Sequence, residues 1–373
     1  MSVTRLFLDA TGSAPMSTRT VQAWQASLAQ GWADPRRIHA PSRQSRALED
    51  SAREAIAEVL DVPTSQTHFT ASPHLGLERV IGGIMRARRG RDRILVSAVE
   101  RDAALQAAQF VAPHGVEVLP VDSQGHVSIT ELRVALEVPD VAMVVVQHAN
   151  QEIGTIQDLA QVHAVTQAAG VPLVVDATAS IGHVPAPTHW DALVAHPADW
   201  GGPGGIGVVA VRQSTRWLHA WPEGDDWAPG GVNVPLALAS AVALQERREN
   251  MDAVAPRLHG YVDRLRAEVS TLEGVHLVGD PHHRLPHVLT FAFLYLDGEP
   301  LLSGLDRAGI AVGSGSACAV STVEPSHVLA ALGALTHGNI RLGLHPAVDD
   351  GDIDRFLEVL PRVVDEVRSH LTR

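Results

Sequence analysis

Over the first half of the chain, short runs of apolar residues alternate with stretches of helical periodicity. The clearest run, residues 141–146, is apolar at every position, which is typical of a strand covered on both faces. Further strands are predicted at 6–9, 67–70, 93–97, 116–120 and 172–176. Helices are predicted at 17–29, 46–60, 75–86, 102–111, 129–136 and 159–169, with a polar loop over 31–42. This alternation predicts an α/β fold with a mostly parallel, doubly wound sheet.

The C-terminal third has a different pattern. Two helices are predicted at 232–248 and 251–272, then strands at 275–278 and 288–293 and a helix at 300–308. Residues 352–371 form a closing amphipathic helix with Ile353, Phe356 and Leu360 on one face. We therefore expect a large α/β domain over 15–250 and a smaller α+β domain formed by 1–14 and 251–373.

Ligands of doubly wound sheets bind beyond the carboxyl ends of the strands. Asn150, Asp176 and the loop after Ala195 each fall just past such an end. We expect a binding site at this edge of the sheet.

Composition narrows the class of protein. The chain has 373 residues, a formal net charge of −13 and 45% hydrophobic residues, enough for a sizeable core. The acidic balance argues against direct nucleic-acid binding and against an anionic membrane surface. A single cysteine excludes an internal disulfide framework. No apolar run reaches membrane-spanning length and no signal-peptide pattern begins the chain, so we expect a cytoplasmic protein.

The chain contains no lysine, and all 29 basic residues are arginine. Codon bias in a GC-rich genome is one explanation of this composition. Whatever the cause, no side-chain amine is present to form a Schiff base.

The only cysteine, Cys318, lies in a Gly- and Ser-rich stretch that runs from Gly313 to Pro325. Such a stretch predicts a flexible polar loop, followed by a helix with Val328, Leu329 and Leu332 on one face. One interpretation of Cys318 is an inert buried residue, which is common for free cysteine. The other is a reachable thiolate nucleophile.

The segments around this cysteine resemble the C-terminal part of cysteine desulfurases, which belong to the class V aminotransferases. These segments are Gly-Ser-Ala-Cys318, Glu324-Pro325-Ser326 and Asn339-Ile-Arg341-Leu-Gly. The resemblance implies the type I fold of pyridoxal phosphate (PLP) enzymes and a dimer. It also implies that Cys318 becomes a persulfide.

Two further segments resemble the same family: the segment from His148 through Asn150 to Asp158, and the segment from Val174 to Gly182. In the family, the aspartate at the position of Asp176 pairs with the pyridine nitrogen of PLP. Arg341 stands where the family binds the substrate carboxylate, and Asn150 is the matching substrate-side asparagine. Each of these three residues has a purely structural alternative, such as a helix cap or strand end for Asp176.

The departures from the family concentrate on the cofactor. Asp199 stands at the position of the Schiff-base lysine; it cannot form an aldimine, and its negative charge would oppose the cofactor phosphate. Further family contacts to PLP are replaced by Pro73, Arg101, Gln151, Ala179 and Ala198, and the family's Arg-Ser-Gly-Thr segment is absent near 230–235. We expect no covalently bound PLP, and at most non-covalent binding, with Asp176 as a vestigial contact.

Histidines gather at His282, His283 and His287, and again at His337 and His345. A loop cluster of this kind can bind a metal, but no Cys, His and carboxylate spacing typical of a metal site accompanies it. We expect no dedicated metal site.

Three functional hypotheses follow. The first is a sulfur relay through a Cys318 persulfide, without independent desulfurase activity, in a homodimer or in a heterodimer with a complete cysteine desulfurase, and serving a sulfur-acceptor protein. The second is an enzyme that uses non-covalent PLP or other chemistry in the same pocket. The third is a scaffold or regulatory subunit in which Cys318 has no chemical role.

Overall fold

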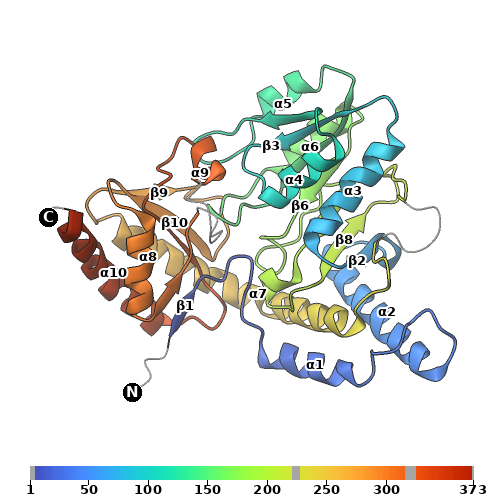
Figure 1. Ribbon diagram of the computed structural model, residues 1–373, viewed down its shortest axis with the longest axis horizontal. Helices are drawn as coiled ribbons and strands as arrows, with labels where there is room; N and C mark the ends of the chain where they lie inside the picture. Colours follow the sequence, from blue (N-terminus) through green and yellow to red (C-terminus); the bar gives the residue numbers. More distant parts are fainter. Residues whose placement is uncertain (1–4, 221–226, 316–324, 372–373) are drawn as a thin grey trace.

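A seven-stranded sheet forms the centre of the larger part of the protein (Figure 1). The computed structural model describes residues 5–220, 227–315 and 325–371. The strand order is β2–β8–β7–β6–β5–β3–β4. The strands are β2 (Thr67–Thr70), β3 (Arg93–Ser97), β4 (Val116–Leu119), β5 (Val141–Gln147), β6 (Leu173–Asp176), β7 (Ala192–Ala195) and β8 (Gly207–Val211). Because only the two pairings of β8 are antiparallel, the predicted mostly parallel sheet is confirmed.

Helices cover both faces of this sheet. The first face packs against α3 (Pro73–Ala87) and α4 (Asp102–Val111). The opposite face packs against α2 (Ala40–Leu60), α5 (Ile129–Ala135), α6 (Leu159–Ala168) and the first half of α7 (Val234–Val269). Successive strand side chains point to opposite faces, so Val144 joins one core and Val145 the other. This double coverage explains why β5 is apolar at almost every position.

A second group of elements lies beside the large sheet (Figure 1). Here β10 (Val288–Phe293) pairs antiparallel with β9 (Val275–Val278) and β12 (Asn339–Gly343). The N-terminal strand β1 (Leu6–Leu8) pairs with β11 (Ile310–Val312), far away in sequence. The second half of α7, α8 (Gly298–Arg307) and α10 (Asp350–Leu371) share one hydrophobic core with these strands. The division into 15–250 and 1–14 with 251–373 stays a prediction.

The two helices predicted at 232–248 and 251–272 are one continuous helix, α7, so that prediction is wrong. The sequence suggested a break because residues 248–250 are polar. In the structure these residues are exposed, and Arg248 and Glu249 form ion pairs with Glu58 and Arg19. The apolar residues before and after them pack into two different cores, and this tertiary packing keeps the helix intact across the polar stretch.

Other boundaries also differ from the prediction. Helix α2 starts at Ala40 rather than at residue 46, and Pro41 lies in its first turn, where a missing N–H costs nothing. The strands β8, β11 and β12 were not predicted from the sequence. The remaining short elements are α1 (Thr18–Leu28), η1 (Thr64–Gln66), η2 (Pro197–Trp200) and α9 (His327–Ala331). Among the helices of the described residues, none has both the length and the apolarity needed to cross a bilayer.

The core beside β10 generates a stability prediction. Phe291 is fully buried in the central strand of the three-stranded sheet, whereas Phe110 is 74% exposed. We expect Phe291→Ala to lower the free energy of unfolding by about 3–5 kcal/mol, because it leaves a cavity. The matched control Phe110→Ala should change it by less than about 0.5 kcal/mol. Urea denaturation of both variants checks this, and equal effects would contradict the packing described here.

Candidate functional site

The carboxyl ends of three neighbouring strands bring the predicted site residues to one edge of the sheet. Asp176 is the last residue of β6 and pairs in register with Gln147, the last residue of β5. The backbone N–H of His148 donates to the Asp176 carbonyl over 2.8 Å, which holds the segment with Asn150 against β6. Asp199 lies in the short helix η2, directly after β7. The expectation that these segments meet at one edge is confirmed.

Asp176 forms an ion pair with Arg101 at this edge. Both Nε and Nη2 of Arg101 approach Oδ2 of Asp176, at 2.7 and 2.6 Å. The other carboxylate oxygen accepts the backbone N–H of Thr178 at 3.0 Å, and Arg101 Nη2 donates to the Thr178 hydroxyl at 3.0 Å. The Asp176 side chain is 1% exposed and the Arg101 side chain 12% exposed. A guanidinium therefore contacts the carboxylate that would otherwise face a pyridine nitrogen.

Asp199, for which the family resemblance implies the position of the lysine, is a buried carboxyl group with 1% of its surface exposed. Burial raises the pKa of Asp199 to about 7, although the positive charges of His196 and Arg101 act in the opposite direction. Near neutral pH this carboxyl group is therefore partly protonated. The expected electrostatic opposition to a phosphate is weaker than the sequence suggested, but a carboxyl group still forms no aldimine.

The start of α3, where the family resemblance implies a contact with the cofactor phosphate, offers few free donors. The helix α3 begins at Pro73, which has no N–H, and the Ser72 hydroxyl accepts the N–H of Leu75 at 3.1 Å. Two donors of the first turn are thus absent or already bonded, and such donors are what a helix N-terminus offers a phosphate. Together with the Arg101–Asp176 pair and the missing lysine, this means that the residues present do not fit PLP as the family holds it.

The Asn150 side chain holds its own loop together. Its amide group donates to the Val99 carbonyl at 2.9 Å and accepts the N–H groups of Glu152 and Ile153 at 2.8 and 2.9 Å. These bonds use most of its hydrogen-bonding capacity. They favour the structural alternative, and a contact between Asn150 and a substrate stays a prediction.

Arg341 lies on β12, and its Nη2 donates to Asp9 Oδ1 at 3.1 Å. Its Nε is buried and has no hydrogen-bond partner among the described residues. The backbone of Arg341 exchanges two hydrogen bonds with Gly313, so this arginine lies at the base of the loop that leads to Cys318. Carboxylate binding by Arg341 stays a prediction.

Cys318 itself lies outside the described residues, but both ends of its loop are described. On one side, Gly315 donates its N–H to the Asn339 side chain, and a β-carbon at Gly315 would overlap the Glu152 carboxyl group. On the other side, the Ser326 hydroxyl caps α9 and donates to Glu152 Oε1 at 2.7 Å. Glu152 therefore contacts both ends of the loop.

Sequence reasoning did not single out Glu152 as a functional candidate. It is 7% exposed, and burial raises its pKa to about 7, although the Ser326 hydrogen bond and the Arg341 charge act to lower it. The only sequence signal was a carboxylate placed between Asn150 and Gly154 in a segment that resembles the family. The buried cluster of His183, Asp199 and His287 was also missed, because its members are distant in sequence.

The buried ion pair generates a prediction. Arg101→Met should lower the free energy of unfolding by about 3–5 kcal/mol, because Asp176 stays buried without its partner. Adding Asp176→Asn should recover part of this loss, because the double variant holds no uncompensated charge. Urea denaturation measures both, with Arg362→Met as a control that disrupts only an exposed pair with Glu358. If Arg101→Met had the same free energy of unfolding as the wild type, this would contradict the described ion pair.

The chain was compared with known protein families and structures. The class-V aminotransferase family matches residues 6–356. Cysteine desulfurase IscS 1 of Archaeoglobus fulgidus is 32% identical, and the match covers 97% of this chain and 98% of that protein. An IscS-like cysteine desulfurase of Mycobacterium tuberculosis is 33% identical, with 97% of each chain covered.

Solved structures agree with the fold. A NifS-like protein superposes with a TM-score of 0.89 at 23% identity, covering 97% of this chain and 99% of that one. The apo structure of a cysteine desulfurase from Thermococcus onnurineus gives a TM-score of 0.86 at 21% identity, with 97% and 95% covered. The predicted type I fold of PLP enzymes is confirmed. The chain belongs to the class-V aminotransferase family, and its relatives there are cysteine desulfurases of the IscS and NifS type.

Proposed function

We propose that this protein is a cysteine desulfurase-like sulfur relay, which carries sulfur as a persulfide on Cys318 and has no PLP-dependent desulfurase activity of its own. The observation that carries this proposal is the absence of any lysine, with the buried Asp199 at the family position. Desulfuration on PLP needs an amine for the Schiff base and for proton transfer at the substrate. The relay of an existing persulfide needs neither.

The transfer step is a thiol–persulfide exchange. The Cys318 thiolate attacks the terminal sulfur of a donor persulfide, an S–S bond forms at Cys318 Sγ, and the donor S–S bond breaks. The donor leaves as a thiolate, so the terminal sulfur changes its carrier and no external oxidant or reductant is consumed. A second thiolate on an acceptor protein then removes the sulfur in the same way.

The surroundings of the loop support this role. Cys318 is the third residue after Gly315, so at most about 11 Å of extended chain separates their Cα atoms. The Arg341 guanidinium lies beside Gly313, where the loop begins, and a positive charge close to a thiol would favour the thiolate. A thiol on a short loop with fixed ends suits a group that accepts sulfur from one partner protein and donates it to another.

A relay of this kind needs a source of persulfide and an acceptor. Under this proposal, a complete cysteine desulfurase supplies the donor persulfide. It does so either as the partner in a heterodimer or in a transient complex. If the protein instead forms a homodimer, the donor must reach Cys318 from outside the assembly.

The first prediction from this proposal concerns Cys318. The purified full-length chain, mixed with a persulfide-loaded cysteine desulfurase or with glutathione persulfide, should gain the mass of one sulfur atom. The adduct should disappear on reduction. Intact-mass spectrometry measures both changes, and no other thiol of this chain interferes, because Cys318 is the only cysteine.

The control is Cys318→Ala, which should gain no sulfur while its unfolding midpoint stays unchanged. If native Cys318 reacts neither with iodoacetamide nor with the persulfide donors, the relay proposal is wrong. The scaffold hypothesis would then be favoured, and partner binding should survive Cys318→Ala.

The second prediction concerns the cofactor. After incubation with PLP and borohydride, a pyridoxyl group should form on no side chain, because the N-terminal amine is the only primary amine of the protein. The same protein should release no sulfide from cysteine. Asp199→Lys should yield little adduct, and adding Arg101→His should increase it, because Asp176 is then released from its guanidinium partner. Peptide mass spectrometry locates the adducts.

Two outcomes would count against this reading. Sulfide release by wild-type protein free of other desulfurases would overturn the relay proposal. Co-elution of stoichiometric PLP with the wild-type chain would favour the alternative of non-covalent PLP.

A further inference from the structure

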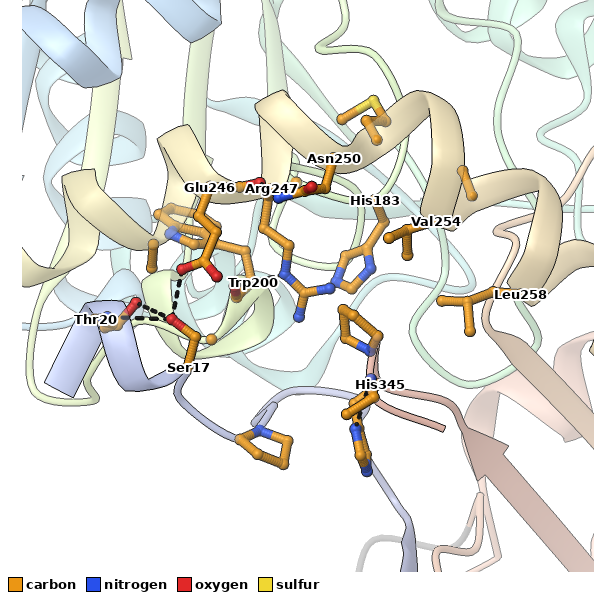
Figure 2. A pocket seen from close by; sticks show the side chains of 18 of the residues that line it. Ser17, Thr20, His183, Trp200, Glu246, Arg247, Asn250, Val254, Leu258 and His345 are labelled. Atoms are coloured by element: carbon orange, nitrogen blue, oxygen red, sulfur yellow. Dashed lines mark hydrogen bonds between the residues drawn. The ribbon is translucent and has the colours of Figure 1, made fainter. Parts of the chain in front are cut away.

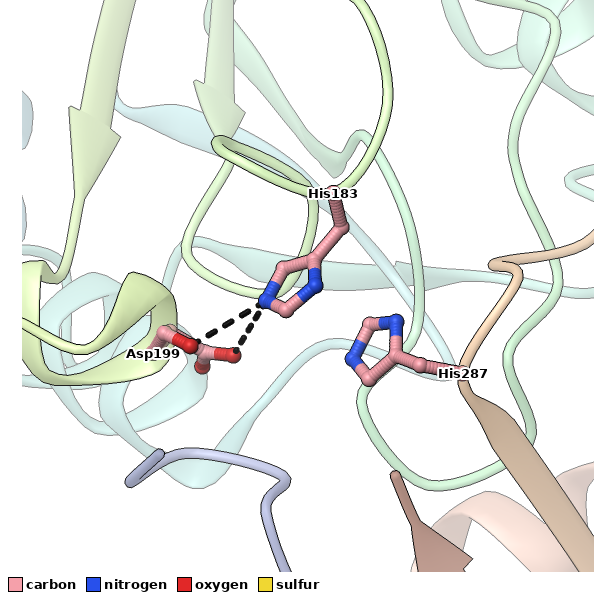
Figure 3. Close-up of side chains that lie close together, drawn as sticks. All are labelled: His183, Asp199 and His287. Atoms are coloured by element: carbon pink, nitrogen blue, oxygen red, sulfur yellow. Dashed lines mark hydrogen bonds and ion pairs between the residues drawn. The ribbon is translucent and has the colours of Figure 1, made fainter. Parts of the chain in front are cut away.

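Three buried side chains from separate parts of the chain meet beneath the sheet edge: His183, Asp199 and His287 (Figure 3). One potential ligand atom from each lies within 4.8 Å of the others. The two imidazole rings stack, with centroids 3.7 Å apart. His183 Nε2 lies 3.1 Å from the Asp199 carbonyl oxygen and 3.6 Å from its Oδ1.

Three polar atoms of this cluster lack hydrogen-bond partners among the described residues. Neither carboxylate oxygen of Asp199 has a hydrogen-bond partner in the described part of the chain, and neither does Nδ1 of His287. The three residues are 4%, 1% and 1% exposed, in the order of the sequence. Buried polar atoms are satisfied in most folded proteins, since leaving a carboxylate unpaired away from water is costly. A cation bound among these three side chains would offset the cost of burying their unpaired polar atoms.

We propose that His183, Asp199 and His287 form a binding site for a divalent first-row transition metal such as Zn²⁺. Two imidazoles and one carboxylate are ligands that zinc and iron accept readily. Bonds of about 2.0–2.1 Å at a tetrahedral ion place two ligand atoms about 3.4 Å apart, close to the separation of His183 Nε2 and Asp199 Oδ1. On binding, His183 Nε2 exchanges its hydrogen bond to the Asp199 carbonyl for a bond to the ion. Because an imidazole binds a metal in its ring plane and the two rings stack at 14°, one of the rings must rotate out of the stack.

His183 lines a neighbouring cavity, whereas Asp199 and His287 do not. His183 and Trp200 line a largely apolar cavity of about 250 Å³ between α7 and the segment before α1 (Figure 2). Three protein ligands leave a coordination position open, which is typical of zinc sites that bind water or a small anion. The cavity is large enough for such a molecule on the His183 side of the site.

Arg247 is the nearest unfavourable charge. It lines the same cavity, and Figure 2 shows its guanidinium beside the His183 ring. Its Nε donates to the Trp200 carbonyl at 2.8 Å, which holds it in the wall. The carboxylates of Asp199 and Glu246 offset its charge. Removing this charge should therefore strengthen metal binding, whereas removing a ligand should weaken it.

The test is calorimetric titration of the chelator-treated full-length chain with ZnCl₂, in a Cys318→Ala background so that no thiol binds the ion. We expect about one equivalent of zinc. His287→Asn and Asp199→Asn should each weaken binding by about 100-fold or more. Arg247→Gln should tighten it. The matched control is His282→Asn, an exposed histidine five positions from His287, which should leave the affinity unchanged.

A second measurement on the same protein needs no ligand variant to fold. X-ray absorption at the zinc edge should report nitrogen and oxygen neighbours at about 2.0–2.1 Å, with outer-shell scattering from histidine. Substoichiometric zinc, equal weakening by His282→Asn, or a spectrum without histidine scattering would each overturn the proposal. These results would leave persulfide transfer to Cys318 untouched, so the two proposals fail separately.

Discussion

The ion pair between Arg101 and Asp176 fixes the edge of the sheet on which the arguments about the cofactor and the metal depend. A buried charge is tolerated only when it is paired and hydrogen-bonded, and here the guanidinium and the Thr178 N–H satisfy both carboxylate oxygens. The pair connects Arg101, the N-cap residue of α4, to Asp176, the last residue of β6. Because breaking such a pair is costly, a ligand that needs Asp176 must first compete with Arg101.

This edge holds more carboxyl groups than cations, and burial decides their protonation. Glu100 lies next to Arg101 in sequence and is fully buried; desolvation, together with the Asp176 charge, raises its pKa to about 8. Asp199 is shifted in the same direction. A bound cation would be an alternative way to neutralise Asp199.

The ends of the Cys318 loop are held by other residues than those of this edge. Its two ends are fixed by Gly313, Gly315 and Ser326, which contact Arg341 and Glu152. A β-carbon at 313 or 315 would overlap the side-chain ends of Asp9, Arg341 or Glu152, so these side chains would have to move to make room for it. Fixed ends hold the base of the loop beside the arginine. The cofactor contacts can therefore be lost without disturbing the anchors of the cysteine, as the relay proposal requires.

The sequence alone determined the alternation of strands and helices, because apolar runs and helical periodicity are local properties of the chain. It also determined the missing lysine and the place of Asp176 and Asp199 beyond strand ends. Only the tertiary structure joined α7 across its polar stretch and paired β1 with β11, since those outcomes depend on packing between distant residues. It alone paired Arg101 with Asp176 and gathered His183, Asp199 and His287, because side-chain partners far apart in sequence leave no periodic signal.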